Sequence, residues 1–263
     1  LSNMINLVFD LKNLEYFLCI LIRITGFVFT APIFSQRGIP RQFKVVFSIF
    51  LAGLIYGTMG SHSNLQYQTI WGYSLIIIKE AVTGLLIGLS VSICTTIVDF
   101  AGRIIDMEAG LSMVNLMDPS TNQMVSVSGA IYQYGVMLML LLTGMHRYFI
   151  QALAEPFVLI PVTGAVFNTD KLLNAIVMFM SDYIKIGFRI CLPVFAVMLL
   201  LNAVLGIMAR VAPQMNMFSV GMQLKVLVGL CVIFLTIGMM PSISNIIFRE
   251  MKVLITTFVD VMT

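Results

Sequence analysis

The residues that could carry out chemistry are a few charged side chains set in long apolar runs. Lys79, Glu80, Asp99 and Asp106 follow one another along one stretch, where facing lipid would be costly. One interpretation is a proton or substrate relay in a small secondary membrane transporter, although the internal repeat common in such carriers is not evident. Lys79 and Glu80 fit either a protein interface or water-filled path, or a helix end from which both reach polar surroundings. Asp99 and Asp106 lie four and three residues from Arg103, so both can pair with it on a helix surface.

Enzymatic chemistry finds little support in the sequence. Gly110 and Ser112, with His146 downstream, are residue types found at the active site of a membrane serine protease. Such a protease is expected to have a glycine two residues after the serine, but here Met113 and Val114 follow Ser112. No His/Cys/Asp group has the spacing of metal ligands, and no glycine-rich loop ends in Lys-Ser/Thr. The four cysteines are scattered singly and are interpreted as buried thiols. We therefore expect no catalytic residue, cofactor or metal.

The elements that must position these residues are membrane-length helices. The chain is 59% hydrophobic and 10% charged, with mean hydropathy +1.00, whereas about 25% charged residues is usual in soluble domains. Apolar runs separated by short polar segments predict an all-α fold, a polytopic helical membrane protein forming one domain over 1–263. About six long helices are expected. Their predicted ranges are 14–34, 43–60, 71–98, 124–145, 172–208 and 225–248.

Two of these helices are too long for an upright crossing. Range 71–98 corresponds to about 42 Å of helix, against about 30 Å of bilayer core. It and 172–208 must tilt, kink or project, and Pro193 offers one kink. A shorter apolar piece, 147–160, ends at Pro161 and suits an interfacial or re-entrant segment.

Lysine and arginine in the short loops predict the orientation. Basic residues around 37–44 place the first loop in the cytoplasm, and alternation then puts 99–123 and 209–224 on the same side with both termini outside. Arg249 and Lys252 argue against this orientation, since they would place the C-terminus in the cytoplasm.

A glycine pair and a loop form the next two motifs. Glu80, Gly84 and Gly88 are spaced by four, and Gly84-x-x-x-Gly88 lets another helix approach closely. The loop that begins after the helical charges contains Asp118-Pro119, which stops a helix. It is nevertheless rich in large apolar side chains. It fits either a flexible plug, in which methionine repacks around changing contours, or ordinary packing between helices.

A polar cluster separates the apolar runs 190–209 and 226–248. Its members are Arg210, Pro213, Gln214, Asn216 and Phe218. Hydrocarbon offers no hydrogen bonds to such groups, so the cluster needs water or protein around it. We predict the tip of a helical hairpin that makes contact with something.

Taken together, these residues resemble the FliR family of flagellar biosynthesis proteins, whose relatives serve virulence type III secretion systems. The correspondence runs in order over nearly the whole chain. It is carried by Arg23, Gly26, Ala31-Pro32-Ile33-Phe34, Ile39-Pro40, Lys44, Glu80, Gly84, Gly88, Gly102, Asp106, Gly110, Asp118-Pro119, Asn202, Gly206, Arg210, Pro213, Gln214, Asn216, Phe218 and Gly221. One departure is Gln223, where the family usually has proline.

The resemblance implies a non-enzymatic subunit of the type III protein export gate. Such a subunit would lie at the flagellar basal body in the bacterial inner membrane, its tilted helices part of a helical assembly. It would help form and close the channel for unfolded flagellar proteins. Its partners would be FliP-type and FliQ-type subunits, an FlhB-type switch protein and the exported proteins, with no nucleic acid. Residues 1–171 would be the FliP-like part, and 172–263 the FliQ-like helical hairpin.

The resemblance also implies roles for the motifs. The loop 110–128 would be the plug that fills the closed pore. Its named residues are Gly110, Met113, Met117, Asp118 and Pro119. Glu80, Gly84, Gly88 and Asp106 would serve helix packing and assembly, and the hairpin tip would lie at the cytoplasmic entrance of the gate near the FlhB-type protein.

Overall fold

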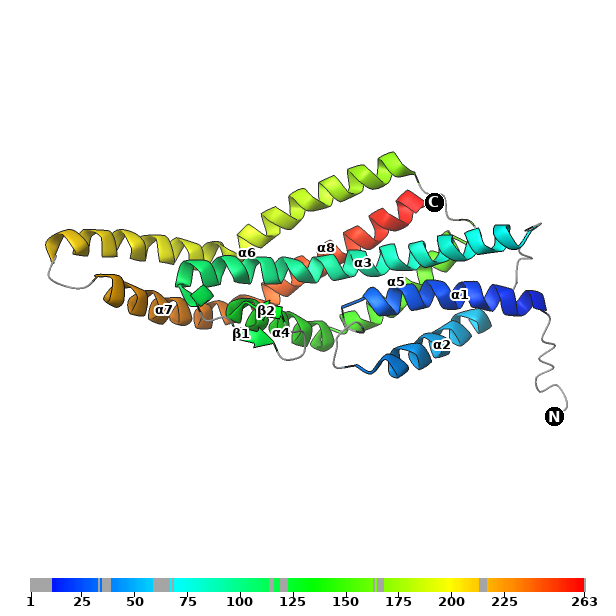
Figure 1. Cartoon of the computed structure of the whole chain (residues 1–263), viewed down its shortest axis with the longest axis horizontal. Helices are drawn as coiled ribbons and strands as arrows, with labels where there is room; N and C mark the ends of the chain where they lie inside the picture. The colour runs from blue at the N-terminus through cyan, green and yellow to red at the C-terminus, as the bar shows by residue number, and fades with distance from the viewer. Residues whose placement is uncertain are drawn as a thin grey trace. The chain divides into compact units, whose positions relative to one another are not determined.

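The chain folds into long helices joined by short segments (Figure 1). The computed structural model describes residues 11–32, 34, 39–58, 67, 69–113, 116–118, 123–162, 164, 168–212 and 217–262. The elements are α1 (Leu11–Thr30), α2 (Arg41–Thr58), α3 (Ile70–Ala109), the 3₁₀ turn η1 (Leu111–Met113), β1 (Leu116–Asp118), β2 (Gln123–Val125), α4 (Val127–Leu142), α5 (Met145–Leu159), α6 (Thr169–Val211), α7 (Met217–Thr236), the 3₁₀ turn η2 (Ile237–Met239) and α8 (Met240–Met262). The predicted all-α, polytopic fold is confirmed, with one three-residue strand pair added.

By length and composition, four stretches of the described residues could cross a membrane. They are Asn13–Thr30, Trp71–Ala109, Thr169–Val211 and Ser219–Met262. A fifth crossing exists if α4 and most of α5 count as one broken span, whereas a re-entrant loop made of the same two helices would not cross. The helix expected at 43–60 is present as α2 but is not among these candidate spans.

Some helices end at other residues than the sequence predicts. α3 continues past 98 to Ala109, because its buried apolar face persists through the charged segment. The range expected as one helix at 225–248 is divided between α7 and α8. Pro241 cannot donate an N–H group to the carbonyl of Ile237, which favours the break at η2. Pro193 lies inside α6 without ending it, and Figure 1 shows α6 changing direction along its length.

The chain divides into two compact units. The first takes the described residues of Leu1–Ser92, Tyr148–Leu173 and Leu254–Thr263, and the second those of Ile93–Arg147 and Asn174–Val253. In the first, α1 packs on α2 and on the early part of α3. Its most buried apolar side chains are Cys19, Ile20, Ile24, Val28, Ala52 and Val91. Each unit contains residues from both sides of the 171/172 boundary. The division into a FliP-like and a FliQ-like part at 171/172 therefore stays a prediction.

The late part of α3 belongs to the second unit and buries one face. Its inward face carries Cys94, Ile97, Val98, Ala101, Ile105 and Ala109, all nearly inaccessible. The Tyr183 hydroxyl of α6 donates to the Thr96 carbonyl at 3.2 Å. The hydroxyls of Tyr132 in α4 and Thr236 in α7 share a hydrogen bond of 2.5 Å. The first bond is exposed and joins α6 to the helix that carries the acidic residues, and the second is buried and joins α7 to α4.

Candidate functional site: a buried ion pair and a clamped loop

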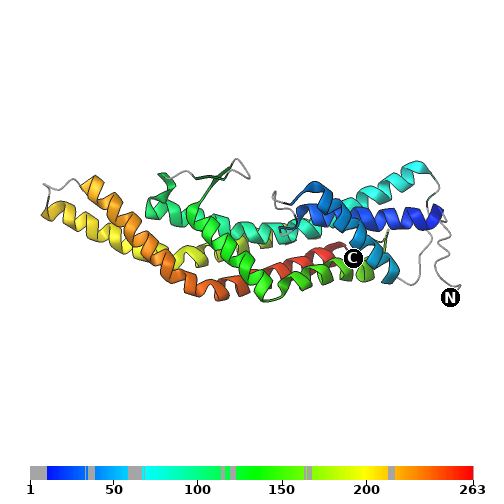
Figure 2. The same ribbon diagram turned by 90° about the horizontal axis from the view of Figure 1, so that it is seen from below.

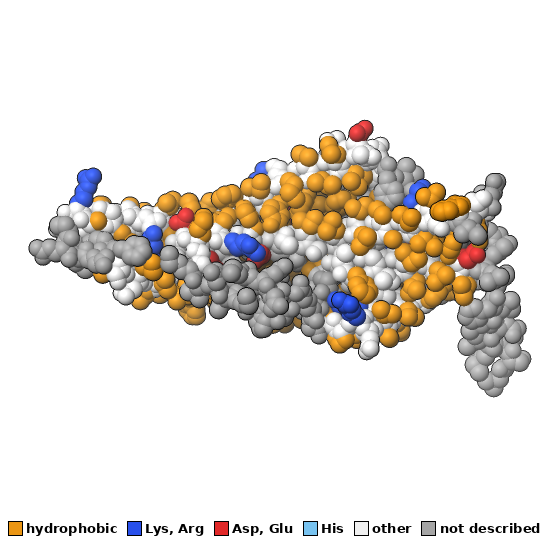
Figure 3. Space-filling view, viewed as in Figure 1, with side chains coloured by type: hydrophobic (Ala, Val, Ile, Leu, Met, Phe, Trp, Pro, Cys, Tyr) orange, Lys and Arg blue, Asp and Glu red, His pale blue; other side chains and the backbone are white. Residues whose placement is uncertain are grey.

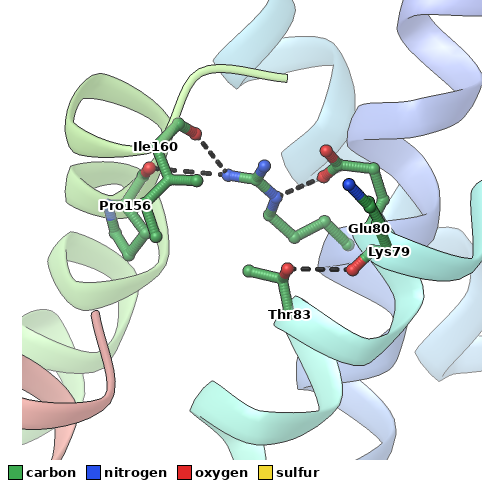
Figure 4. A network of polar contacts seen from close by, with 6 residues as sticks. Lys79, Glu80, Thr83, Pro156 and Ile160 are labelled. Atoms are coloured by element: carbon green, nitrogen blue, oxygen red, sulfur yellow. Dashed lines mark hydrogen bonds and ion pairs between the residues drawn. The ribbon is translucent and has the colours of Figure 1, made fainter. Parts of the chain in front are cut away.

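Two charged residues of the first unit form a buried ion pair. Arg23 Nε of α1 donates to Glu80 Oε2 of α3 at 2.5 Å, and the side chains are 2% and 0% exposed (Figure 4). An unpaired charge in such surroundings costs several kcal/mol, about 3–5 kcal/mol when one partner of a buried pair is removed. Glu80 therefore lies at an interface between helices of this chain, and not at a helix end.

Arg23 also joins α1 to the C-terminal end of α5. Its Nη1 donates to the carbonyl of Ile160 at 2.9 Å and, more weakly, to that of Pro156 at 3.5 Å. The guanidinium carbon lies 4.4 Å from the centroid of the Phe157 ring. The last carbonyls of a helix have no donor within the helix, and a cation there meets the negative end of the helix dipole. One arginine thus links three segments.

The α1–α3 crossing beside this pair requires glycine. A Cβ atom on Gly84 would collide with the carbonyl oxygen of Arg23. One on Gly88 would collide with the Thr30 hydroxyl and lie 3.0 Å from the Phe27 carbonyl. The helix that Gly84-x-x-x-Gly88 admits is therefore α1 of the same chain, which brings Glu80 within reach of the arginine.

In the second unit, the Asp106 carboxylate caps the start of α4. Its Oδ1 accepts from Ser128 N at 3.1 Å, its Oδ2 is 3.4 Å from that nitrogen, and it also accepts from the Ser128 hydroxyl. The Ser126 hydroxyl oxygen accepts from Gly129 N at 2.9 Å. The first N–H groups of a helix have no partner within the helix, so these bonds satisfy two of them. A carboxylate is also favoured at the positive end of the helix dipole.

A glycine contact completes this junction, which we call the loop base: Gly102, Asp106, Ser126, Ser128 and Gly129. A Cβ atom on Gly102 would collide with the backbone of Gly129, so α3 and α4 touch backbone to backbone. Gly102, Asp106 and Gly110 are spaced by four along α3 and supply the close approach, the cap and the helix end. The two ends of the segment 111–125 are therefore held close together, where α3 ends and α4 begins.

The residues predicted for the plug lie on this segment. Gly110 has φ +75°, a left-handed conformation that glycine adopts freely at a helix C-terminus. Met113 belongs to η1, and Met117 and Asp118 belong to β1, which pairs antiparallel with β2. Pro119 lies outside the described residues. In Figure 2 the two strands lie beside the end of α3 and the start of α4.

The predicted hairpin tip lies between α6 and α7. Arg210 is exposed in the last turn of α6, and Phe218 belongs to the first turn of α7. A Cβ atom on Gly221 would lie 3.6 Å from Leu205 Cδ1, so the two helices are in contact next to the tip. The remaining tip residues, Pro213, Gln214 and Asn216, lie outside the described residues.

The remaining residues considered for ion transfer, catalysis or metal binding do not form a common site in the described structure. Arg103 Nε pairs with Asp99 Oδ2 at 2.8 Å on the surface of α3, while Asp106 serves the loop base and makes no ion pair with this arginine in the described structure. Ser112 is exposed in η1, and no hydrogen bond joins it to His146, although both residues are described. No group of three or more His, Cys, Asp or Glu residues in the described part could hold a metal ion.

Two partners were not predicted: Arg23 for Glu80, and Ser128 for Asp106. A signal existed for the first, because Arg23 and Glu80 each interrupt a membrane-length apolar run, and opposite charges in such runs tend to pair. For the second, the serines at 126 and 128 directly before an apolar run are typical of a helix start. Neither signal specifies which distant residue completes the contact.

Buried ion pairing, glycine crossings and long apolar helices define a polytopic membrane protein whose charges hold its helices together. The model of the family described as bacterial export proteins, family 1, matches residues 14–251. The chain is 30% identical to flagellar biosynthetic protein FliR of Bacillus subtilis over 88% of this chain and 90% of that protein. It is 28% identical to FliR of Buchnera aphidicola subsp. Baizongia pistaciae over 90% and 91%, and 26% to FliR of Escherichia coli over 85% and 84%. The chain belongs to the FliR family of bacterial export proteins.

Proposed function

We propose that this chain is a non-enzymatic subunit of the flagellar type III protein export gate in the bacterial inner membrane. It helps form, and helps close, the channel for unfolded flagellar proteins. The match to the export family over 14–251 carries this proposal, and the name flagellar biosynthetic protein borne by its FliR relatives supports the flagellar branch. FliP-type and FliQ-type subunits and an FlhB-type switch protein are its proposed neighbours.

The segment 110–128 is the proposed plug. Support comes from the loop base, which fastens both ends of the segment to α3 and α4 through hydrogen bonds to Asp106. Beyond that base, the described residues of the segment form a 3₁₀ turn and two strands of three residues. A segment with few regular hydrogen bonds opens at low free-energy cost, whereas the helices that hold it need not unfold. The plug can therefore move aside while its attachment stays in place.

A wide apolar surface supports the assembly proposal. Figure 3 shows hydrophobic side chains gathered along α6 on the face that it draws. The large exposed members on α6 and α7 include Leu192, Leu199, Leu200, Val204, Ile207, Leu227, Leu230 and Phe234. Helices of neighbouring subunits and lipid would cover these side chains, while the polar hairpin tip with Arg210 would face the gate entrance.

Co-purification tests the proposed gate membership. A tagged copy of the chain would be expressed in its own cells from its native promoter and extracted in mild detergent. We expect FliP-type and FliQ-type proteins to co-purify in a fixed ratio, and the tagged copy to restore secretion of flagellar proteins to a strain lacking the untagged gene. A tagged unrelated polytopic protein is the control. If the chain purifies alone from membranes that contain those proteins, the proposal is wrong.

A further inference from the structure

An exposed apolar strip runs along the early part of α3. Its members are Trp71 (82% exposed), Leu75 (62%), Ile78 (57%), Val82 (36%), Leu85 (44%) and Leu89 (44%), here called the α3 strip. They are spaced alternately by four and three residues, which keeps them on one side of a helix. Spacings that alternate between four and three residues are also typical of a helix that packs along another at a shallow angle.

One positively charged side chain, that of Lys79, lies at the edge of this strip. Lys79 is exposed and directly follows Ile78. The adjacent carboxylate, Glu80, is turned into the core by its 2.5 Å bond with Arg23. Within the described residues Lys79 takes part in no ion pair, and Figure 4 shows only its backbone carbonyl in a bond, accepting from the Thr83 hydroxyl at 2.9 Å.

Neither water nor lipid satisfies the whole strip. Water would leave a contiguous row of large apolar side chains exposed, which in soluble surroundings marks an interaction site. Hydrocarbon would leave the ammonium group of Lys79 without a partner. This lysine lies about 12 Å along the helix from Trp71, and tryptophan is the residue enriched at the membrane–water boundary. An apolar helix with one carboxylate would cover the apolar side chains and would also pair with the ammonium group of Lys79.

We infer that the α3 strip is the contact surface for one apolar helix of another membrane protein, with an Asp or Glu carboxylate facing Lys79. The ammonium group donates to that carboxylate, and the apolar side chains of the two helices interdigitate on either side. The inference deepens the proposed function, on which it rests only for the expectation that this neighbour is a gate subunit. A second copy of this chain does not fit, because the strip carries no exposed acid and a symmetric contact would bring lysine toward lysine.

Photo-crosslinking in intact cells tests the surface. The photoreactive residue p-benzoylphenylalanine would replace Leu75, Val82 or Leu89 in separate strains of the full-length chain. We expect all three positions to form adducts with one helix of one other membrane protein, identified by mass spectrometry and bearing an Asp or Glu. The comparison position is Val46 on α2, which is also apolar and 65% exposed.

The charge is tested in the same strains. Lys79→Glu is expected to lower the adduct yield about tenfold, the factor that corresponds to losing a charged hydrogen bond. Replacing the partner carboxylate with lysine in the Lys79→Glu strain is expected to restore the yield, and Lys79→Arg to retain it. Lys185→Met removes an exposed lysine already paired with Asp182 at 3.1 Å in its own chain, and serves as the control.

Several results would overturn the inference. They are adducts with lipid alone or with a second copy of this chain, a partner helix without a carboxylate, and yields unchanged by Lys79→Glu. The two proposals fail separately. Lipid-only adducts in cells where FliP-type and FliQ-type proteins still co-purify would reject the surface but not the gate. A charge-rescued adduct with a membrane protein outside the gate would reject the gate but not the surface.

Discussion

Replacing Glu80 with glutamine tests how much the buried ion pair contributes to stability. The side chain keeps its size but loses its charge, so Arg23 stays buried without a counter-charge. Breaking one side of a buried pair costs about 3–5 kcal/mol. The amide oxygen still accepts a hydrogen bond, and Arg23 keeps its 2.9 Å bond to Ile160 and its contact with Phe157. We therefore expect the lower end, about 3 kcal/mol, or a fall in Tm of roughly 6–12 °C for a chain of this size.

The assay uses the buried thiols of the purified chain in detergent. Cys19, Cys94 and Cys191 are buried, whereas Cys231, which was expected to be buried, is exposed. Once the exposed thiol has been blocked, a thiol-reactive fluorescent dye labels the buried thiols on heating as the helices separate. Asp182→Asn, which breaks an exposed pair with Lys185, is the control and should cost less than about 1 kcal/mol.

A double variant sharpens the test. Arg23→Met combined with Glu80→Met removes both buried charges, so it should be more stable than either single variant. The reasoning is refuted if Glu80→Gln shifts Tm no more than Asp182→Asn does, or if the double variant loses the full sum of the single losses.

Three further variants test the helix crossing, the helix end and the loop base. Gly84→Ala should destabilise the chain by about 1–3 kcal/mol, since the added methyl meets the backbone of α1; Gly57→Ala, with open space around it, should be neutral or stabilising in the same dye assay. Gly110→Ala should cost about 1–2 kcal/mol because φ is +75°, whereas Gly206→Ala in α6 should not; equal Tm values for this pair would contradict the left-handed conformation. Asp106→Asn should weaken the cap of α4 and speed hydrogen exchange of its first N–H groups about tenfold, as expected for loss of a charge-assisted bond; unchanged exchange would show that the carboxylate does not hold the loop base.

The helices were predictable because their signals are local. Apolar runs of membrane length predicted α1, α3 and α6, and the glycine spacing at 84 and 88 predicted a close helix crossing. The extension of α3 to Ala109 was underestimated, since the charges after residue 98 resemble a loop when the buried face beneath them is not seen. The break between α7 and α8 was missed because hydrophobicity continues across it, although Pro241 lies beside it.

The contacts of the candidate site could not be predicted in full, because they join distant parts of the sequence. Arg23 and Glu80 are 57 positions apart, and Asp106 and Ser128 are 22 apart. Spacing alone favours the nearer pairing of Asp106 with Arg103, because residues three apart on a helix are neighbours. In the folded chain the unsatisfied N–H groups of α4 meet Asp106 instead, and a buried cap outweighs an exposed ion pair.

The most direct test of the account is the ion permeability of cells in which the proposed plug is removed. Deleting residues 112–122 takes away η1 and β1 but leaves the loop base, so α3 and α4 remain joined where Asp106 holds them. The account predicts that the complex is recovered in normal amount while the membrane becomes leaky to small ions. A Gly/Ser segment of the same length in place of 112–122 should leak as well, since it lacks the apolar side chains. Normal recovery of the complex with unchanged ion conductance would contradict the assignment of this segment as the plug.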